Sequence, residues 1–148
     1  MAERPDTLRR REDIYRDAVA VISRDYATDL HVDSVARAIG TSRRQLQRVF
    51  DQVGGVSFRN VLTEVRMRNA RRLLLETHQP VNVVARRVGY SQPAQFAKTF
   101  RRYFGDVPST YRSSPRPVAV APSATGATAR LRPLAGHDAL AAVAAPSR

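Results

Sequence analysis

The stretch VARAIGTS at residues 35–42 recurs as VARRVGYS at residues 84–91, 49 positions further along the chain. Downstream the agreement continues at an offset of 50, in three pairs: Leu46 with Phe96, Arg48 with Lys98, and Phe50 with Phe100. The second copy therefore carries one inserted residue. Because glycine, serine, apolar and basic positions all agree, the repeat predicts two equivalent structural units in one chain.

Each copy has the pattern of a helix-turn-helix unit. Gly40 suits the left-handed position just past a helix, and the Ser42 hydroxyl can accept hydrogen bonds from the N–H groups that open the next helix. Gly89 and Ser91 supply the same residue types in the second copy. A turn of this kind lets the first helix cross a DNA backbone while the second enters the major groove.

The periodicity of the surrounding sequence is also helical, and no segment reads as a convincing strand. An amphipathic first helix is indicated by apolar residues three and four positions apart: Ile14, Tyr15, Ala18, Val19, Ile22 and Tyr26. Between the two copies, Ser57 is a candidate cap for a longer helix that runs from Phe58 to Leu74. These patterns predict an all-α fold.

The second helix of each unit carries the candidate DNA-reading side chains. In the first copy, the polar residues opposite the apolar positions are Arg43, Arg44, Gln47 and Arg48. In the second copy, they are Gln92, Gln95, Lys98 and Arg101. Arginine can bind guanine bidentately and glutamine can bind adenine, whereas Arg101, lower on its helix, is better placed for phosphate. For any one of these residues, a solvated basic helix face is the alternative interpretation.

The net charge of +12 is concentrated in the repeat region. Residues 30–112 hold 15 basic and 5 acidic side chains, whereas residues 1–29 hold 6 and 7. Arginine-rich codon usage is an alternative explanation, since Lys98 is the only lysine, but codon usage alone would not concentrate the excess in one segment. A basic surface favours polyanions such as DNA.

Residue types that carry catalysis or bind metals are scarce. The chain has no cysteine, and its three histidines, His31, His78 and His137, are far apart in sequence. We find no catalytic triad, metal-ligand spacing or phosphate-binding loop, and therefore expect no enzyme activity, no metal and no cofactor. Without a secretory signal or a membrane-length apolar run, we expect a cytoplasmic, nucleoid-associated protein.

The second copy contains an extended set of residues at fixed spacing: Ala85, Gly89, Tyr90, Ser91, Phe96, Lys98, Phe100, Arg101, Arg102, Tyr103, Phe104, Gly105, Pro108, Tyr111 and Arg112. This set resembles the signature of the AraC/XylS family of bacterial transcription regulators. The resemblance covers about residues 12–112. It implies about seven helices, with a long linker helix joining two helix-turn-helix subdomains whose recognition helices enter adjacent major grooves about 34 Å apart.

The sequence departs from the family pattern at a few positions. His31 replaces the usual serine or threonine cap, which predicts a weaker helix start. Pro93 and Ala94 replace residues that are usually polar, so the second unit is expected to read fewer bases than the first. Many family members carry a ligand-binding domain before the DNA-binding domain, and we expect none here.

These observations predict a flexible N-terminus at residues 1–11 and one DNA-binding domain at 12–112. Within the domain we expect a first subdomain at 12–56, a linker helix at 57–76 and a second subdomain at 77–112. Residues 113–148 are rich in alanine, proline and serine, which predicts a disordered tail.

The function expected is sequence-specific binding of double-stranded DNA as a transcriptional regulator that acts as a monomer. The family resemblance favours activation over repression. RNA polymerase is an open candidate as a further partner of the tail, and no membrane partner is expected. The alternative is a non-specific nucleoid or architectural protein, which would use the same basic segment without reading bases.

Overall fold

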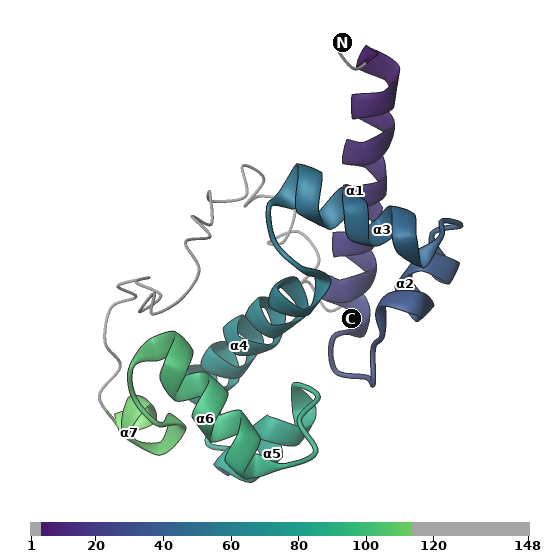
Figure 1. Ribbon diagram of the computed structural model, residues 1–148. Coiled ribbons are helices and arrows are strands. Elements are labelled where there is room, and N and C mark those ends of the chain that lie inside the picture. The colour runs from purple at the N-terminus through teal and green to yellow at the C-terminus, as the bar shows by residue number, and fades with distance from the viewer. Residues whose placement is uncertain (1–3, 114–148) are drawn as a thin grey trace.

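The computed structural model describes residues 4–113, and every regular element within them is a helix (Figure 1). The elements in chain order are α1 (Pro5–Asp25), α2 (Val32–Ala38), α3 (Arg43–Val49), the π-helical turn η1 (Phe50–Gly54), α4 (Phe58–Glu76), α5 (Val81–Arg87), α6 (Pro93–Phe104) and α7 (Pro108–Ser113). The all-α prediction with seven α-helices and a long linker helix is confirmed. Apart from Ser113, the predicted disordered tail lies outside the described residues.

The N-terminal prediction was wrong for residues 5–11, because α1 begins at Pro5 rather than after residue 11. Proline is favoured in a first helical turn, and the acidic Asp6 lies next to the positive end of the helix dipole. The apolar pattern begins only at Ile14 because residues 5–10 are exposed and bury nothing. Periodicity therefore could not reveal these turns.

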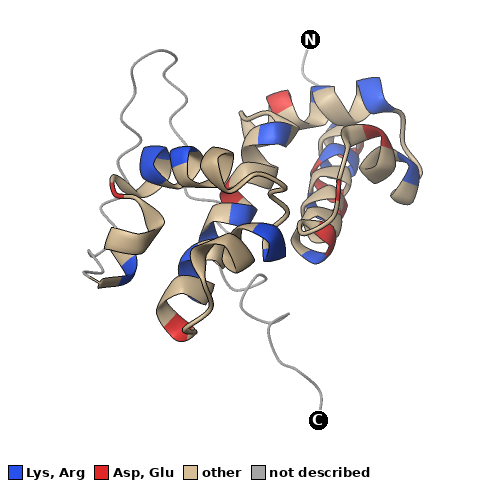
Figure 2. Ribbon diagram, turned by 90° about the horizontal axis from the view of Figure 1, so that it is seen from below, with Lys and Arg blue, Asp and Glu red and all other residues tan. Residues whose placement is uncertain are grey.

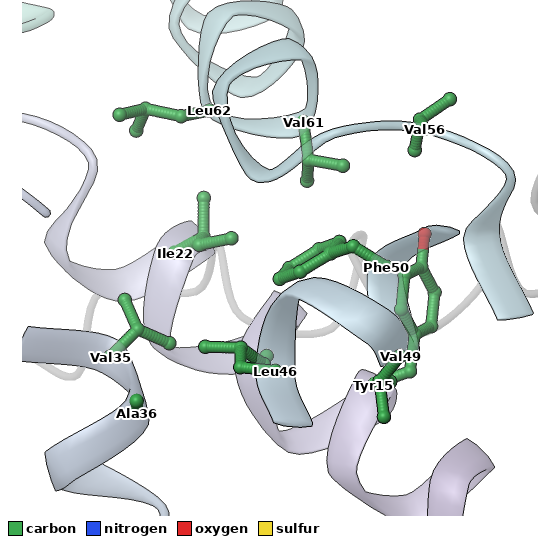
Figure 3. Close-up of a cluster of buried hydrophobic side chains, with 11 residues drawn as sticks. Tyr15, Ile22, Val35, Ala36, Leu46, Val49, Phe50, Val56, Val61 and Leu62 are labelled. Atoms are coloured by element: carbon green, nitrogen blue, oxygen red, sulfur yellow. The ribbon is translucent and has the colours of Figure 1, made fainter. Parts of the chain in front are cut away.

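Two separate hydrophobic cores hold the two halves of the fold. The first core consists of Tyr15, Ala18, Ile22, Val35, Ala36, Leu46, Val49, Phe50, Val56, Val61 and Leu62 (Figure 3). The second core consists of Met67, Ala70, Leu74, Val84, Ala85, Val88, Phe96, Phe100 and Tyr111. The early turns of α4 pack into the first core and its later turns into the second, so α4 is the structural link between the two units.

The turn of the first unit follows its sequence pattern closely. Gly40 has a φ of +71°, the left-handed conformation that favours glycine. The Ser42 side chain accepts a hydrogen bond from the Gln45 N–H at 3.1 Å, which caps α3. His31, in contrast, makes no side-chain cap at the start of α2, as its replacement of serine or threonine predicts.

Helix α7, the last helix within the described residues, is held against α4 by arginine hydrogen bonds. Arg71 on α4 donates through Nε to the Tyr111 hydroxyl at 2.8 Å. Arg112 donates through Nε to the Leu74 carbonyl at 3.2 Å and through Nη2 to the Gln79 carbonyl. The Tyr-Arg pair noted in the sequence therefore closes the second core against the linker helix.

Candidate nucleic-acid interface

The helix α3 presents one apolar face and one polar face. Its Leu46 and Val49 are completely or almost completely buried in the first core. The four reading candidates predicted from the sequence are all exposed: Arg43, Arg44, Gln47 and Arg48. Arg43 donates to Asp33 of α2 at 3.1 Å, while the side chains of the other three make no hydrogen bond or ion pair within residues 4–113. The latter three are therefore available to an incoming ligand.

The helix α6 has the same two-sided character. Phe96 and Phe100 are fully buried, and the Thr99 hydroxyl is satisfied by the Gln95 carbonyl at 2.9 Å. The four candidates predicted from the sequence again lie on the exposed side: Gln92, Gln95, Lys98 and Arg101. Figure 2 shows lysine and arginine on helices of both halves of the molecule.

The inserted residue of the second copy lies in its turn and not within its recognition helix. Ser42 directly precedes α3, but Gln92 rather than Ser91 directly precedes α6, and its side chain makes no cap hydrogen bond. Pro93 occupies the first turn of α6. Backbone N–H groups in a first turn have no partner within the helix, so the helix loses no hydrogen bond through the proline. The offset of 50 therefore holds along both recognition helices.

This register adds Gln45 to the candidate interface, a residue that the sequence analysis missed. Gln45 is exposed and corresponds, at the offset of 50, to the candidate Gln95. Its Oε1 accepts a hydrogen bond from the Thr41 hydroxyl at 3.1 Å. The offset itself was the signal that could have identified it.

The two units are joined through the side chain of Arg66, which projects from the middle of α4. Its Nε donates to the Tyr26 carbonyl at 2.8 Å, and its Nη2 donates to the Thr28 carbonyl at 2.9 Å. The same guanidinium lies over the Tyr90 ring, 5.6 Å from the centroid, in the range of a cation–π contact. Burial lowers the pKa of Arg66 below its ordinary value, and the opposing effects of Tyr90 and Asp29 offset only part of this shift. One side chain thus contacts the end of α1 and the turn before α6.

The described residues offer little for other chemistry. Between residues 4 and 113, no three histidine, cysteine, aspartate or glutamate side chains are grouped to hold a metal ion. His31 lies beside Asp29 at 3.2 Å on the surface, and His137 is outside the described range. None of the helices within residues 4–113 is long and apolar enough to cross a membrane.

Comparison with known proteins agrees with this geometry. A family profile described as a helix-turn-helix domain matches residues 35–114. The lactose operon transcription activator of Staphylococcus xylosus is 35% identical over 101 residues, which are 68% of this chain and 36% of that protein. The chain spans about a third of the length of the curated relatives that it matches.

Solved structures of the same type are similar along most of their length. The C-terminal domain of AraT, a response regulator from Geobacillus stearothermophilus, matches with a TM-score of 0.67 at 33% identity. The match covers 76% of this chain and 93% of that domain's chain. The DNA-binding domain of the global transcriptional factor AdpA, solved in complex with a target DNA, matches with a TM-score of 0.63 at 30% identity. The match covers 66% of this chain and 88% of that domain's chain.

The fold and these matches define a helix-turn-helix protein of the DNA-binding class. Within that class, the chain belongs to the AraC family, whose members are DNA-binding transcriptional regulators.

Proposed function

We propose that this protein regulates transcription by inserting α3 and α6 into adjacent major grooves on one face of a promoter site. The observation that carries the proposal is the paired geometry of the two helices. Each buries its apolar side in its own core and exposes amide and guanidinium groups on the opposite side. These groups match the donor and acceptor patterns of base edges in the major groove.

The residues proposed to read bases are Arg43, Arg44, Gln45, Gln47 and Arg48 in the first unit and Gln92, Gln95 and Lys98 in the second. Arg101 is proposed to contact phosphate. Arg43 would exchange its exposed ion pair with Asp33 for a base or phosphate contact. Since exposed pairs contribute only about 0–1 kcal/mol, this exchange costs little.

We further propose that one chain occupies each site and that binding activates transcription in the cytoplasm, through contact with RNA polymerase. Two unequal reading units in one chain can span two grooves without a second copy. Activation is supported by the relative from Staphylococcus xylosus, which is named as a transcription activator.

The test is selection of preferred duplexes from random-sequence DNA by the full chain, followed by titration of the selected duplex and a scrambled duplex. We expect the selected site to bind at least about 10³-fold more tightly, with one chain per duplex in sedimentation. Insertion of five base pairs between the two half-sites should remove most of this preference, because it rotates them onto opposite faces. Equal affinity for both duplexes would instead indicate a non-specific nucleoid protein.

A further inference from the structure

An open groove of about 520 Å³ lies between the N-terminal turns of α1 and the helix α3. It is lined by Thr7, Arg10, Arg11, Ser42, Arg44, Gln45, Arg48 and Val49. Four of these eight residues are arginines and none is acidic. Two arginines come from each helix, so the groove is a basic surface that neither helix could form alone.

The α1 side of this groove consists of the turns that the sequence analysis predicted as flexible. Figure 1 shows these turns extending past α3. Residues 5–10 are exposed and belong to neither hydrophobic core, so these turns bury no apolar surface of their own. As the continuation of a helix that packs in the first core, they place cationic groups beside α3.

Three of the four arginines of the groove, Arg10, Arg44 and Arg48, are free to bind an anion. Arg10, Arg44 and Arg48 are exposed, and none of their side chains makes a hydrogen bond or ion pair within the described part of the chain. Like charges around one groove repel each other, and a bound anion removes that repulsion. Arginine binds phosphate oxygens bidentately, and the Thr7 hydroxyl can donate to the same group.

We propose that this groove receives the sugar–phosphate backbone of the DNA strand that borders the first major groove, with Arg10 binding a backbone phosphate. This inference rests on the function proposed above. Arg44 and Arg48 belong both to the groove and to the base-reading face of α3, so DNA that reaches them brings its backbone to the α1 side. The N-terminal turns of α1 therefore extend the interface beyond the two helix-turn-helix units.

The test compares Arg10→Ala with Arg9→Ala in the full chain, on a duplex selected by the wild-type protein. Arg9 is the matched control, because it is an exposed arginine on the same helix but does not line the groove. Loss of one phosphate contact should reduce the slope of log affinity against log salt by about 0.9. Between 50 and 200 mM salt, Arg10→Ala should therefore lose about 3.5-fold less affinity than the wild type. Arg9→Ala should keep the wild-type slope.

A methylphosphonate scan identifies the contacted phosphate. Replacing one phosphate at a time by the uncharged group should reveal a position, flanking the first half-site, at which wild type and Arg9→Ala lose affinity but Arg10→Ala does not. Equal losses in all three proteins at every position would overturn the inference, even if sequence-specific binding holds. Failure of the wild type to prefer any duplex would contradict the proposed function itself.

Discussion

The Nε of Arg66 donates to the carbonyl oxygen of Tyr26 at 2.8 Å, joining the linker helix to the end of α1. The two residues are 40 positions apart in sequence, and the ring of Tyr26 packs at the edge of both hydrophobic cores. The same guanidinium also lies over the Tyr90 ring, so this one side chain links the first unit to the second.

Arg66→Lys should weaken this contact between the units. An ammonium group cannot match the planar guanidinium, which donates to two carbonyl oxygens and lies over the Tyr90 ring. Hydrogen bonds to charged groups contribute about 1.5–3 kcal/mol, so we expect the free energy of unfolding to fall by about that amount. Urea denaturation measures this change. In the DNA assay, the variant should tolerate altered half-site spacing better than the wild type. An unchanged spacing preference would show that the Arg66 contact does not set the relative orientation of the two units.

Gly89→Ala should destabilise the fold more than Gly40→Ala. Both glycines have positive φ, which costs a residue with a Cβ about 1–2 kcal/mol. A Cβ at Gly40 would meet nothing within 4 Å, whereas one at Gly89 would lie 2.9 Å from the Tyr26 carbonyl oxygen and 2.9 Å from Nη2 of Arg66. Thermal unfolding of both variants measures the difference. Equal losses of stability would show that the neighbours of Gly89 move aside at no cost.

Tyr15→Phe should stabilise the first core. The Tyr15 hydroxyl is buried and has no hydrogen-bond partner within the described residues (Figure 3). A buried unsatisfied polar group costs about 1–3 kcal/mol, so we expect the free energy of unfolding to rise by about 1 kcal/mol. The phenyl ring keeps the edge-on contact with Phe50, whose centroid is 5.4 Å away.

The same substitution should change the alkaline limb of the stability profile. Burial, and to a lesser extent Glu64, raises the pKa of Tyr15 above its ordinary value. The neutral form is therefore favoured by folding, and its contribution is complete below the pKa of the unfolded chain and is lost as pH rises through the higher folded pKa. Denaturation midpoints measured from pH 8 upward should fall less steeply above about pH 10 in Tyr15→Phe. Identical slopes would contradict the assignment.

Arg48→Ala and Arg101→Ala should have different effects on DNA binding. If Arg48 reads a base, its loss should cost about 1–3 kcal/mol on the selected site and relax preference at one or two base pairs. If Arg101 contacts phosphate, its loss should weaken selected and random duplexes alike and reduce the salt dependence. Titrations of both variants on both duplexes separate these outcomes. Matching effects would make the assignment of roles wrong.

The sequence predicted those parts of the fold that repeat or bury an apolar face. Both units were found from the repeat, and the linker helix predicted at 57–76 is α4 at Phe58–Glu76. The helical turns at residues 5–11 were missed because they lack apolar periodicity. The sequence also did not show whether Ser91 or Gln92 directly precedes α6. The repeat offset changes from 49 to 50 somewhere between Ser91 and Phe96, and the pattern alone does not locate the inserted residue.

The features of the site that the sequence did not predict share one physical cause. Arg66 reads as one more polar position on a helix until folding brings the carbonyls of Tyr26 and Thr28 to it. Arg10 is equally ordinary in sequence, and it becomes notable only when α1 lies beside Arg44 and Arg48. Long-range contacts of this kind leave no local pattern.

The recognition helices α3 and α6 differ in sequence, and the turns that precede them differ by one residue, although one gene encodes both. If they read DNA as proposed, a point mutation in α6 alters the preference for one half of the target and leaves the other half unchanged. In a two-fold symmetric dimer, the same mutation would alter both halves at once. Such a protein can therefore acquire new operators stepwise during evolution, keeping half of its recognition while the remainder diverges.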